Sequence, residues 1–176
     1  MARNVEIKAH LQQRELSLIR AEQISGKPAE VIHQEDVFFP CDSGRLKLRI
    51  FSPTSGELIY YRRPDQKEPK TSHYSITTTD EPLKLREILE DAYGVRAVIK
   101  KVRYVFLVGR TRIHIDTVEN LGEFLELEVA LGDSEDASPG EEEARALMQE
   151  LGVDEQSLVD WAYVDLIENR AGYQSD

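Results

Sequence analysis

The chain has 176 residues, of which 40% are hydrophobic and 31% charged, and its formal net charge is −11. This composition is typical of a folded protein, and no apolar run reaches the roughly 18 residues of a membrane-spanning helix. The acidic balance argues against a generic nucleic-acid binder, and a single cysteine, Cys41, excludes an internal disulfide. The charged N-terminus does not resemble a secretory signal. We therefore expect a cytoplasmic protein with one domain over residues 1–176 and a core at about 3–167.

Apolar residues recur with a period of 2 in eight segments, which predicts strands, and with a period of 3.6 in four segments, which predicts helices. In chain order we expect a strand at 4–11, a helix at 12–24, strands at 35–39, 45–50, 57–63 and 73–78, a helix at 82–93, strands at 97–107, 112–116 and 125–129, and helices at 139–151 and 155–169. Loops are expected at 40–44, 52–56, 64–72 and 132–140.

The charged residues of these strands are segregated by sign. Residues 96–112 include six bases and no acid, whereas residues 119–143 include ten acids and no base. In a half-buried mixed sheet with helices on one side, these charges would simply face water. In a closed barrel they would face one another inside, and amphipathic helices would cover the apolar outer faces.

Charges buried in a barrel need partners of opposite sign. A polyanion such as triphosphate would neutralise the bases, and a divalent cation would neutralise the carboxylates. We therefore favour an α+β fold, a closed eight-stranded antiparallel β-barrel with flanking α-helices, whose tunnel binds phosphate and metal. No P-loop, dinucleotide-binding, HExxH or GxSxG motif supports a different site.

Five short motifs, in this order along the chain, resemble the CYTH superfamily of class IV adenylate cyclases and thiamine triphosphatases, also called triphosphate tunnel metalloenzymes. They are Glu6-Ile7-Lys8, Leu46-Lys47-Leu48-Arg49, Lys101-Val102-Arg103, His114-Ile115-Asp116 and Glu126-Leu127-Glu128-Val129. The length and the segment 60–65 are most similar to members labelled class IV cyclase-like. The resemblance implies an eight-stranded tunnel that binds a triphosphate beside Mg²⁺ or Mn²⁺.

The resemblance also implies roles for individual residues. The expected metal ligands are Glu6, Glu126 and Glu128. The expected triphosphate-binding residues are Lys8, Lys47, Arg49, Arg63, Lys70, Lys101, Arg103 and Arg112. The expected catalytic residues are Lys8, Lys101, Arg103 and Asp116. Arg62 would replace Arg63 if the strand register shifted by one, and His114 is expected to be structural.

One residue departs from the family's ExExK motif, because Asn4 occupies the position of the first glutamate. An amide oxygen can still bind a hard cation but brings no charge, so a second metal would bind weakly.

Four interpretations remain open: a phosphohydrolase of tripolyphosphate, thiamine triphosphate or a nucleotide, a class IV adenylate cyclase, a non-catalytic triphosphate sensor, or a purely structural or protein-interaction barrel. The expected partner is a small triphosphate-containing molecule, without nucleic acid or membrane. The apolar outer helix faces leave a homodimer possible.

Overall fold

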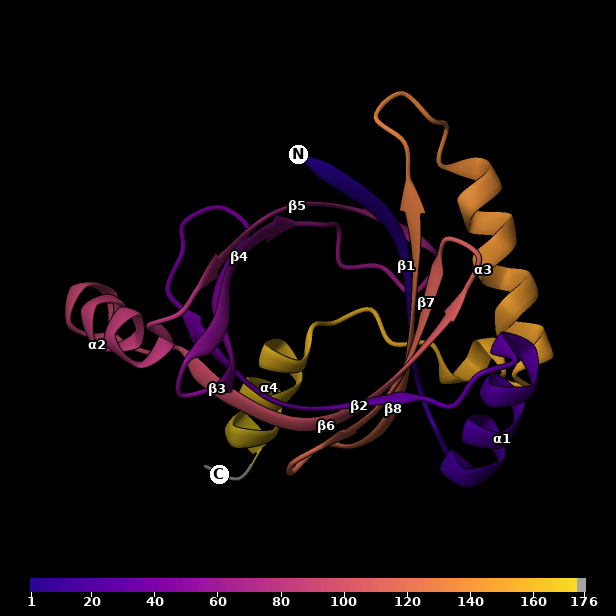
Figure 1. The fold of residues 1–176 in the computed structure, drawn as a ribbon, viewed down its shortest axis with the longest axis horizontal. Coiled ribbons are helices and arrows are strands. Elements are labelled where there is room, and N and C mark those ends of the chain that lie inside the picture. Colours follow the sequence, from indigo (N-terminus) through magenta and orange to yellow (C-terminus); the bar gives the residue numbers. More distant parts are fainter. Residues whose placement is uncertain (174–176) are drawn as a thin grey trace.

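The computed structural model describes the backbone of residues 1–173 and the side chains of residues 1–168. Within this part of the chain, eight strands form one closed antiparallel barrel with four α-helices around it (Figure 1). The strands are β1 (Ala2–His10), β2 (Glu30–Phe39), β3 (Arg45–Ser52), β4 (Ser55–Arg62), β5 (Lys70–Thr79), β6 (Ala97–Val108), β7 (Thr111–Val118) and β8 (Gly122–Leu131). The helices are α1 (Arg14–Ser25), α2 (Pro82–Tyr93), α3 (Ser138–Glu150) and α4 (Tyr163–Tyr173).

Neighbouring strands follow the order β1-β5-β4-β3-β2-β6-β7-β8, and β8 pairs with β1 to close the barrel. The predicted fold class is therefore confirmed. Of the helices in residues 1–173, none is long and apolar enough to cross a membrane.

The hydrophobic core lies between the outside of the barrel and the helices. On β1 the outward residues Val5 and Ile7 have no exposed surface, and they belong to the same cluster as Leu147 and Met148 of α3. Helix α2 covers β2 and β3 in a second cluster that includes Leu48. On these strands the alternation works as predicted, with apolar side chains under the helices and charged side chains facing the barrel axis, although Phe38, Ile59 and Ile76 also line the inside.

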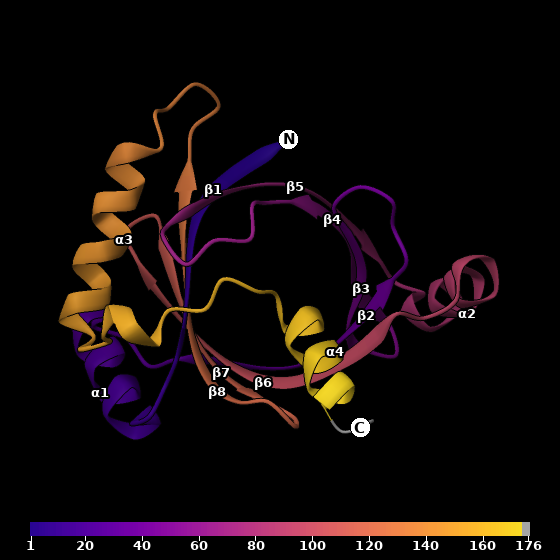
Figure 2. The same cartoon turned by 180° about the vertical axis from the view of Figure 1, so that it is seen from behind.

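The helices cover different parts of the barrel. Both views show α1 and α3 on one side of it and α2 on the opposite side (Figures 1 and 2). Seen from behind, α4 lies across one end of the barrel (Figure 2). This placement leaves the tunnel covered by α4 at one end.

Several predicted boundaries are wrong. The strand expected at 35–39 begins at Glu30, and the strand expected at 57–63 begins at Ser55, inside the expected loop 52–56. The segment 155–169 is not one helix: it contains a 3₁₀ turn at Glu155–Ser157 and an extended stretch, and α4 begins only at Tyr163. The stretch is extended because the backbone N–H of Val159 donates to the carbonyl of Lys8 at 2.8 Å, a tertiary contact that helix periodicity does not report. The strand expected at 73–78 begins earlier, at Lys70, since residues 70–74 pair with β1.

Candidate active site

The inward residues of the barrel surround one highly charged cavity of about 120 Å³. Strand alternation places them there, because residues i and i+2 of a strand share a face. On β1, for example, Asn4, Glu6 and Lys8 all line the cavity. The charged lining residues are Glu6, Lys8, Asp36, Lys47, Arg49, Arg63, Lys101, Arg103, Arg112, Glu126 and Glu128.

Positive charge is in excess inside this acidic chain. Among the described side chains, seven bases and four carboxylates line the cavity. Most of them are shielded from water: the side chains of Lys101 and Arg103 are 2% and 5% exposed, whereas Arg112 at the open end is 45% exposed. Buried cations without enough carboxylates attract a polyanion.

Carboxylates gather where β1, β8 and β7 are neighbours. Glu6 lies directly opposite Glu128, and Lys8 directly opposite Glu126. Burial raises the pKa of Glu6, and Glu126 and Glu128 raise it further, although the guanidinium of Arg63, 3.1 Å away, lowers it. Like charges that share a buried site favour a proton or a cation between them.

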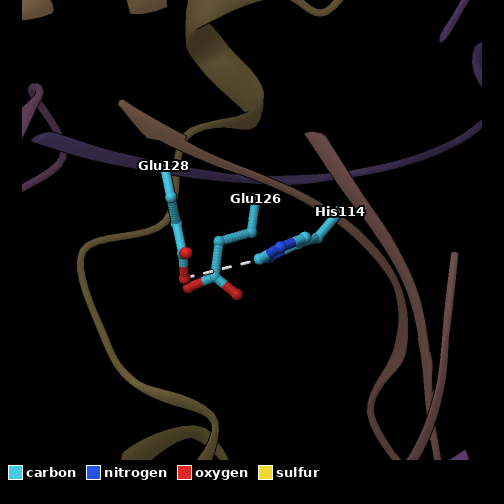
Figure 3. Close-up of side chains that lie close together, drawn as sticks. All are labelled: His114, Glu126 and Glu128. Atoms are coloured by element: carbon cyan, nitrogen blue, oxygen red, sulfur yellow. Dashed lines mark ion pairs between the residues drawn. The ribbon is translucent and has the colours of Figure 1, made fainter. Parts of the chain in front are cut away.

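His114 belongs to the same group. The donor atoms of His114, Glu126 and Glu128 lie within 4.8 Å of one another. Figure 3 shows the three side chains side by side. Burial and the nearby Arg103 lower the pKa of His114 to about 4. The imidazole is therefore neutral at pH 7 and can accept a cation.

These donors fit a divalent cation. Carboxylate oxygens are the preferred ligands of hard divalent ions. Asn4 adds an amide oxygen on the same face of β1, and this buried oxygen has no hydrogen-bond partner among the described residues. Glu6, Glu126 and Glu128 could therefore hold Mg²⁺ or Mn²⁺.

On the opposite wall, three bases converge on Asp36, a residue that the sequence analysis did not single out. Lys47 Nζ lies 3.0 Å and Arg49 Nε 2.9 Å from its carboxylate, and Lys101 Nζ lies 3.9 Å away. Burial raises the pKa of Asp36, but these three cations outweigh it and hold the pKa well below its usual range. Asp36 shares its strand face with Phe38, another lining residue, so strand parity was the signal that could have found it.

Asp116 lies behind the cavity wall. It is completely buried and binds Arg103 through two hydrogen bonds of 2.7 and 2.6 Å. It also accepts a hydrogen bond from the Tyr163 hydroxyl at 2.9 Å. Both oxygens are thus in use, so Asp116 is placed to position Arg103 rather than to touch a ligand.

The structure also distinguishes between the candidate bases near the β4–β5 connection. Arg63 lines the cavity with its side chain 2% exposed, whereas Arg62 is exposed to solvent. Lys70 is buried but is not a lining residue, because its ammonium donates to the backbone carbonyls of Gln66, Val159 and Asp160. The geometry therefore removes Lys70 from the expected triphosphate-binding set.

The start of α4 closes the covered end of the tunnel. The Tyr163 ring lies beneath two ammonium groups, 3.6 Å from Lys8 Nζ and 4.8 Å from Lys101 Nζ. Asp165, in the first turn of α4, is held by Arg45 at 2.7 Å and by Arg96 at 2.9 Å. These contacts fix α4 against the barrel.

Comparison with known proteins gives one family. The model of the CYTH domain matches residues 2–163. A Methanocaldococcus jannaschii protein that carries the provisional name adenylate cyclase is 25% identical over 170 residues, which cover 92% of this chain and 97% of the relative.

Solved structures share the fold. A conserved hypothetical protein of Pyrococcus furiosus has a TM-score of 0.81 at 22% identity, covering 93% of this chain and 99% of that one. A Hippeastrum protein, provisionally an adenylyl cyclase and described as having a dominant triphosphatase activity, has a TM-score of 0.68 at 13% identity, covering 98% and 96%. The family match spans the whole barrel and nearly the whole chain, and the chain therefore belongs to the CYTH domain family.

Proposed function

We propose that this protein is a divalent-metal-dependent enzyme that hydrolyses a triphosphate bound in the tunnel. The observation that carries the proposal is the excess of buried bases in the cavity next to a group of carboxylates. A triphosphate has the charge to neutralise these bases, and guanidinium and ammonium groups match its oxygens.

The bases on the Asp36 wall bind the phosphate chain in this proposal. Lys47, Arg49 and Lys101 share Asp36, and two of them have one further carboxylate each: Glu57 lies 3.9 Å from Arg49 and Asp116 lies 3.4 Å from Lys101. Each base has several N–H donors, so donors remain for phosphate oxygens. Arg63 and Arg112, on the other wall, each contact one glutamate and can bind further phosphate oxygens.

Glu6, Glu126 and Glu128 would hold the Mg²⁺ or Mn²⁺ ion. When bound, such an ion withdraws negative charge from the phosphate oxygens that it contacts. Lys8, Lys101 and Arg103 lie between these carboxylates and Asp36, where they stabilise the charge that develops during phosphoryl transfer. Asp116 and Tyr163 keep Arg103 and the two lysines in place.

Hydrolysis is favoured over cyclisation because it requires only that the phosphate chain is bound, whereas cyclisation also requires a nucleoside whose ribose hydroxyl is held in line with the α-phosphate. The dominant triphosphatase activity described for the Hippeastrum protein supports this choice. The name of the Methanocaldococcus jannaschii relative favours the alternative, in which a ribose hydroxyl attacks the α-phosphate of ATP. Both reactions use the same bases and carboxylates.

A second candidate function is binding without turnover. Asn4 supports it, because this buried residue lines the carboxylate end of the cavity without charge. If catalysis requires a second ion at this position, the amide would leave a tunnel that binds a triphosphate and does not cleave it.

One experiment separates these functions. The protein is incubated with tripolyphosphate, thiamine triphosphate and ATP in separate tubes, with Mg²⁺ or Mn²⁺, and phosphate, pyrophosphate and cyclic AMP are measured. Phosphate release that is lost in the Glu128→Gln variant supports hydrolysis, and the variant also controls for contaminating phosphatases. Cyclic AMP with equal pyrophosphate would identify a cyclase instead, and tight tripolyphosphate binding without products would identify a sensor.

A further inference from the structure

The imidazole of His114 lies beside Glu126 and Glu128, and the proposed function gives it no role. His114 on β7 lies directly opposite Glu126 on β8, and its side chain is 5% exposed. Its Nδ1 atom is buried and has no hydrogen-bond partner among the described residues. A buried polar atom without a partner is unfavourable by about 1–3 kcal/mol, so its persistence indicates a ligand.

The two glutamates beside His114 each keep one oxygen available. Glu126 Oε2 accepts from Arg103 at 2.7 Å, and Glu128 Oε2 accepts from Arg112 at 2.7 Å. Among the described side chains, the partners of the second oxygens are more distant: Glu126 Oε1 lies 3.7 Å from Lys8 Nζ, and Glu128 Oε1 lies 3.8 Å from His114 Nδ1. The arginines thus orient the two carboxylates and leave one oxygen of each for another group.

The three donor groups have the spacing of metal ligands. With metal–ligand bonds of about 2.1 Å, adjacent ligands lie about 3 Å apart and opposite ones about 4.2 Å apart. The 3.8 Å between Nδ1 and Glu128 Oε1 falls in this range, and the whole group lies within 4.8 Å. Figure 3 shows the imidazole and both carboxylates pointing toward a common point.

We infer that His114 is a metal ligand, and that it makes the tunnel select a first-row transition-metal ion such as Mn²⁺ over Mg²⁺. Imidazole nitrogen is a softer donor than carboxylate oxygen, and Mg²⁺ prefers all-oxygen sites with several waters. A site of one nitrogen and two carboxylates therefore binds Mn²⁺ or Co²⁺ more tightly than Mg²⁺. The inference rests on the carboxylate metal site of the proposed function but concerns metal identity rather than turnover.

The test measures metal binding to the full chain without substrate. Binding of Mn²⁺ is followed by the loss of the free-ion EPR signal, and Mg²⁺ is titrated in as a competitor. The visible absorption of Co²⁺ added in place of Mn²⁺ reports the coordinating atoms. The variants are His114→Asn, which substitutes an oxygen donor, His114→Phe, which removes the donor and keeps a ring, Glu128→Gln, and His33→Asn as a matched control at an exposed histidine.

We expect His114→Phe to weaken Mn²⁺ binding at least tenfold and to change the Co²⁺ spectrum. His114→Asn should reduce the preference for Mn²⁺ over Mg²⁺ and retain Mg²⁺ binding within about threefold. The His33→Asn control should bind like the wild type.

The role of His114 would be overturned if both His114 variants keep the Mn²⁺ affinity and the Co²⁺ spectrum of the wild type while Glu128→Gln loses binding. This result would leave the carboxylate metal site intact. Equal Mn²⁺ binding in wild type and Glu128→Gln would instead contradict the metal site itself. Circular dichroism identifies a variant that fails to fold, and His114→Asn, the smaller change, then decides the question.

Discussion

The first prediction concerns Asp36, whose carboxylate is the shared partner of three bases. In the variant D36N a neutral amide replaces a charge that lies 3.0 Å from Lys47 Nζ and 2.9 Å from Arg49 Nε. Removing one partner of a buried ion pair typically destabilises a protein by about 3–5 kcal/mol. The side chains of Lys47 and Arg49 are 12% and 16% exposed, so water compensates in part and we expect the lower figure, about 3 kcal/mol.

For a chain of this length, that loss corresponds to a Tm lower by about 6–12 °C. Differential scanning calorimetry at pH 7 measures it, with Asp42→Asn at an exposed position as the control. The sign of the pH dependence follows from the lowered pKa of Asp36. Its stabilisation is complete above the unfolded pKa of about 3.9 and is lost as the pH falls below it, so the wild type should approach D36N in acid.

Tripolyphosphate gives a second readout. At about 100 times its Kd a ligand stabilises the folded state by about 2.7 kcal/mol. The polyanion supplies D36N with the negative charge that it lacks, so the ligand-induced rise in Tm at one fixed concentration should be larger in D36N than in the wild type. A Tm within 2 °C of wild type, or a smaller rise with ligand, would refute the view that Asp36 neutralises bases awaiting a polyanion.

Three further predictions test other parts of the tunnel. Glu128→Ala should lower metal-dependent turnover at least about 100-fold with an unchanged circular dichroism spectrum, because it removes a metal ligand; wild-type turnover would remove Glu128 from the metal site. Tyr163→Phe should lower the free energy of unfolding, measured in urea, by about 1.5–3 kcal/mol because the hydrogen bond to Asp116 is lost. Tyr163→Leu should lower it further because the ring beneath Lys8 and Lys101 is also lost. Equal losses in the two variants would show that the ring contributes nothing. Burial and Arg49 lower the pKa of Lys47 to about 8, so raising the pH from 7 to 9 removes the charge of this lysine. The affinity for tripolyphosphate, measured by calorimetry, should then fall up to about tenfold more in wild type than in Lys47→Arg, because the guanidinium of the variant stays charged. Parallel pH profiles of the two proteins would contradict this.

The alternation of apolar and charged residues along the strands predicted most of the fold. Strand parity alone separated the outward Val5 and Ile7 from the inward Glu6 and Lys8, and the structure has the same division. The reason is local: successive side chains of a strand point to opposite faces whatever the rest of the chain does. The same parity placed Lys101 and Arg103 in the tunnel.

Contacts between distant segments decided the rest. Asp36 has a special role only because the pairing of β2 with β3 and β6 places Lys47, Arg49 and Lys101 beside it. Lys70 has the charge of a phosphate ligand, but its ammonium donates hydrogen bonds to the carbonyls of Val159 and Asp160. The interruption before α4 depends on a hydrogen bond to β1, about 150 residues earlier in the chain.

His114 shows the same division most clearly. Its inward direction follows from strand parity. Its buried Nδ1 atom, which has no hydrogen-bond partner among the described residues, meets the carboxylates of Glu126 and Glu128 only once β7 and β8 are paired in this register. Sequence periodicity determines to which face of the sheet a side chain points. Which side chains lie next to it inside the barrel depends on the order and register of the strands, and these are set by pairing between segments far apart in the chain.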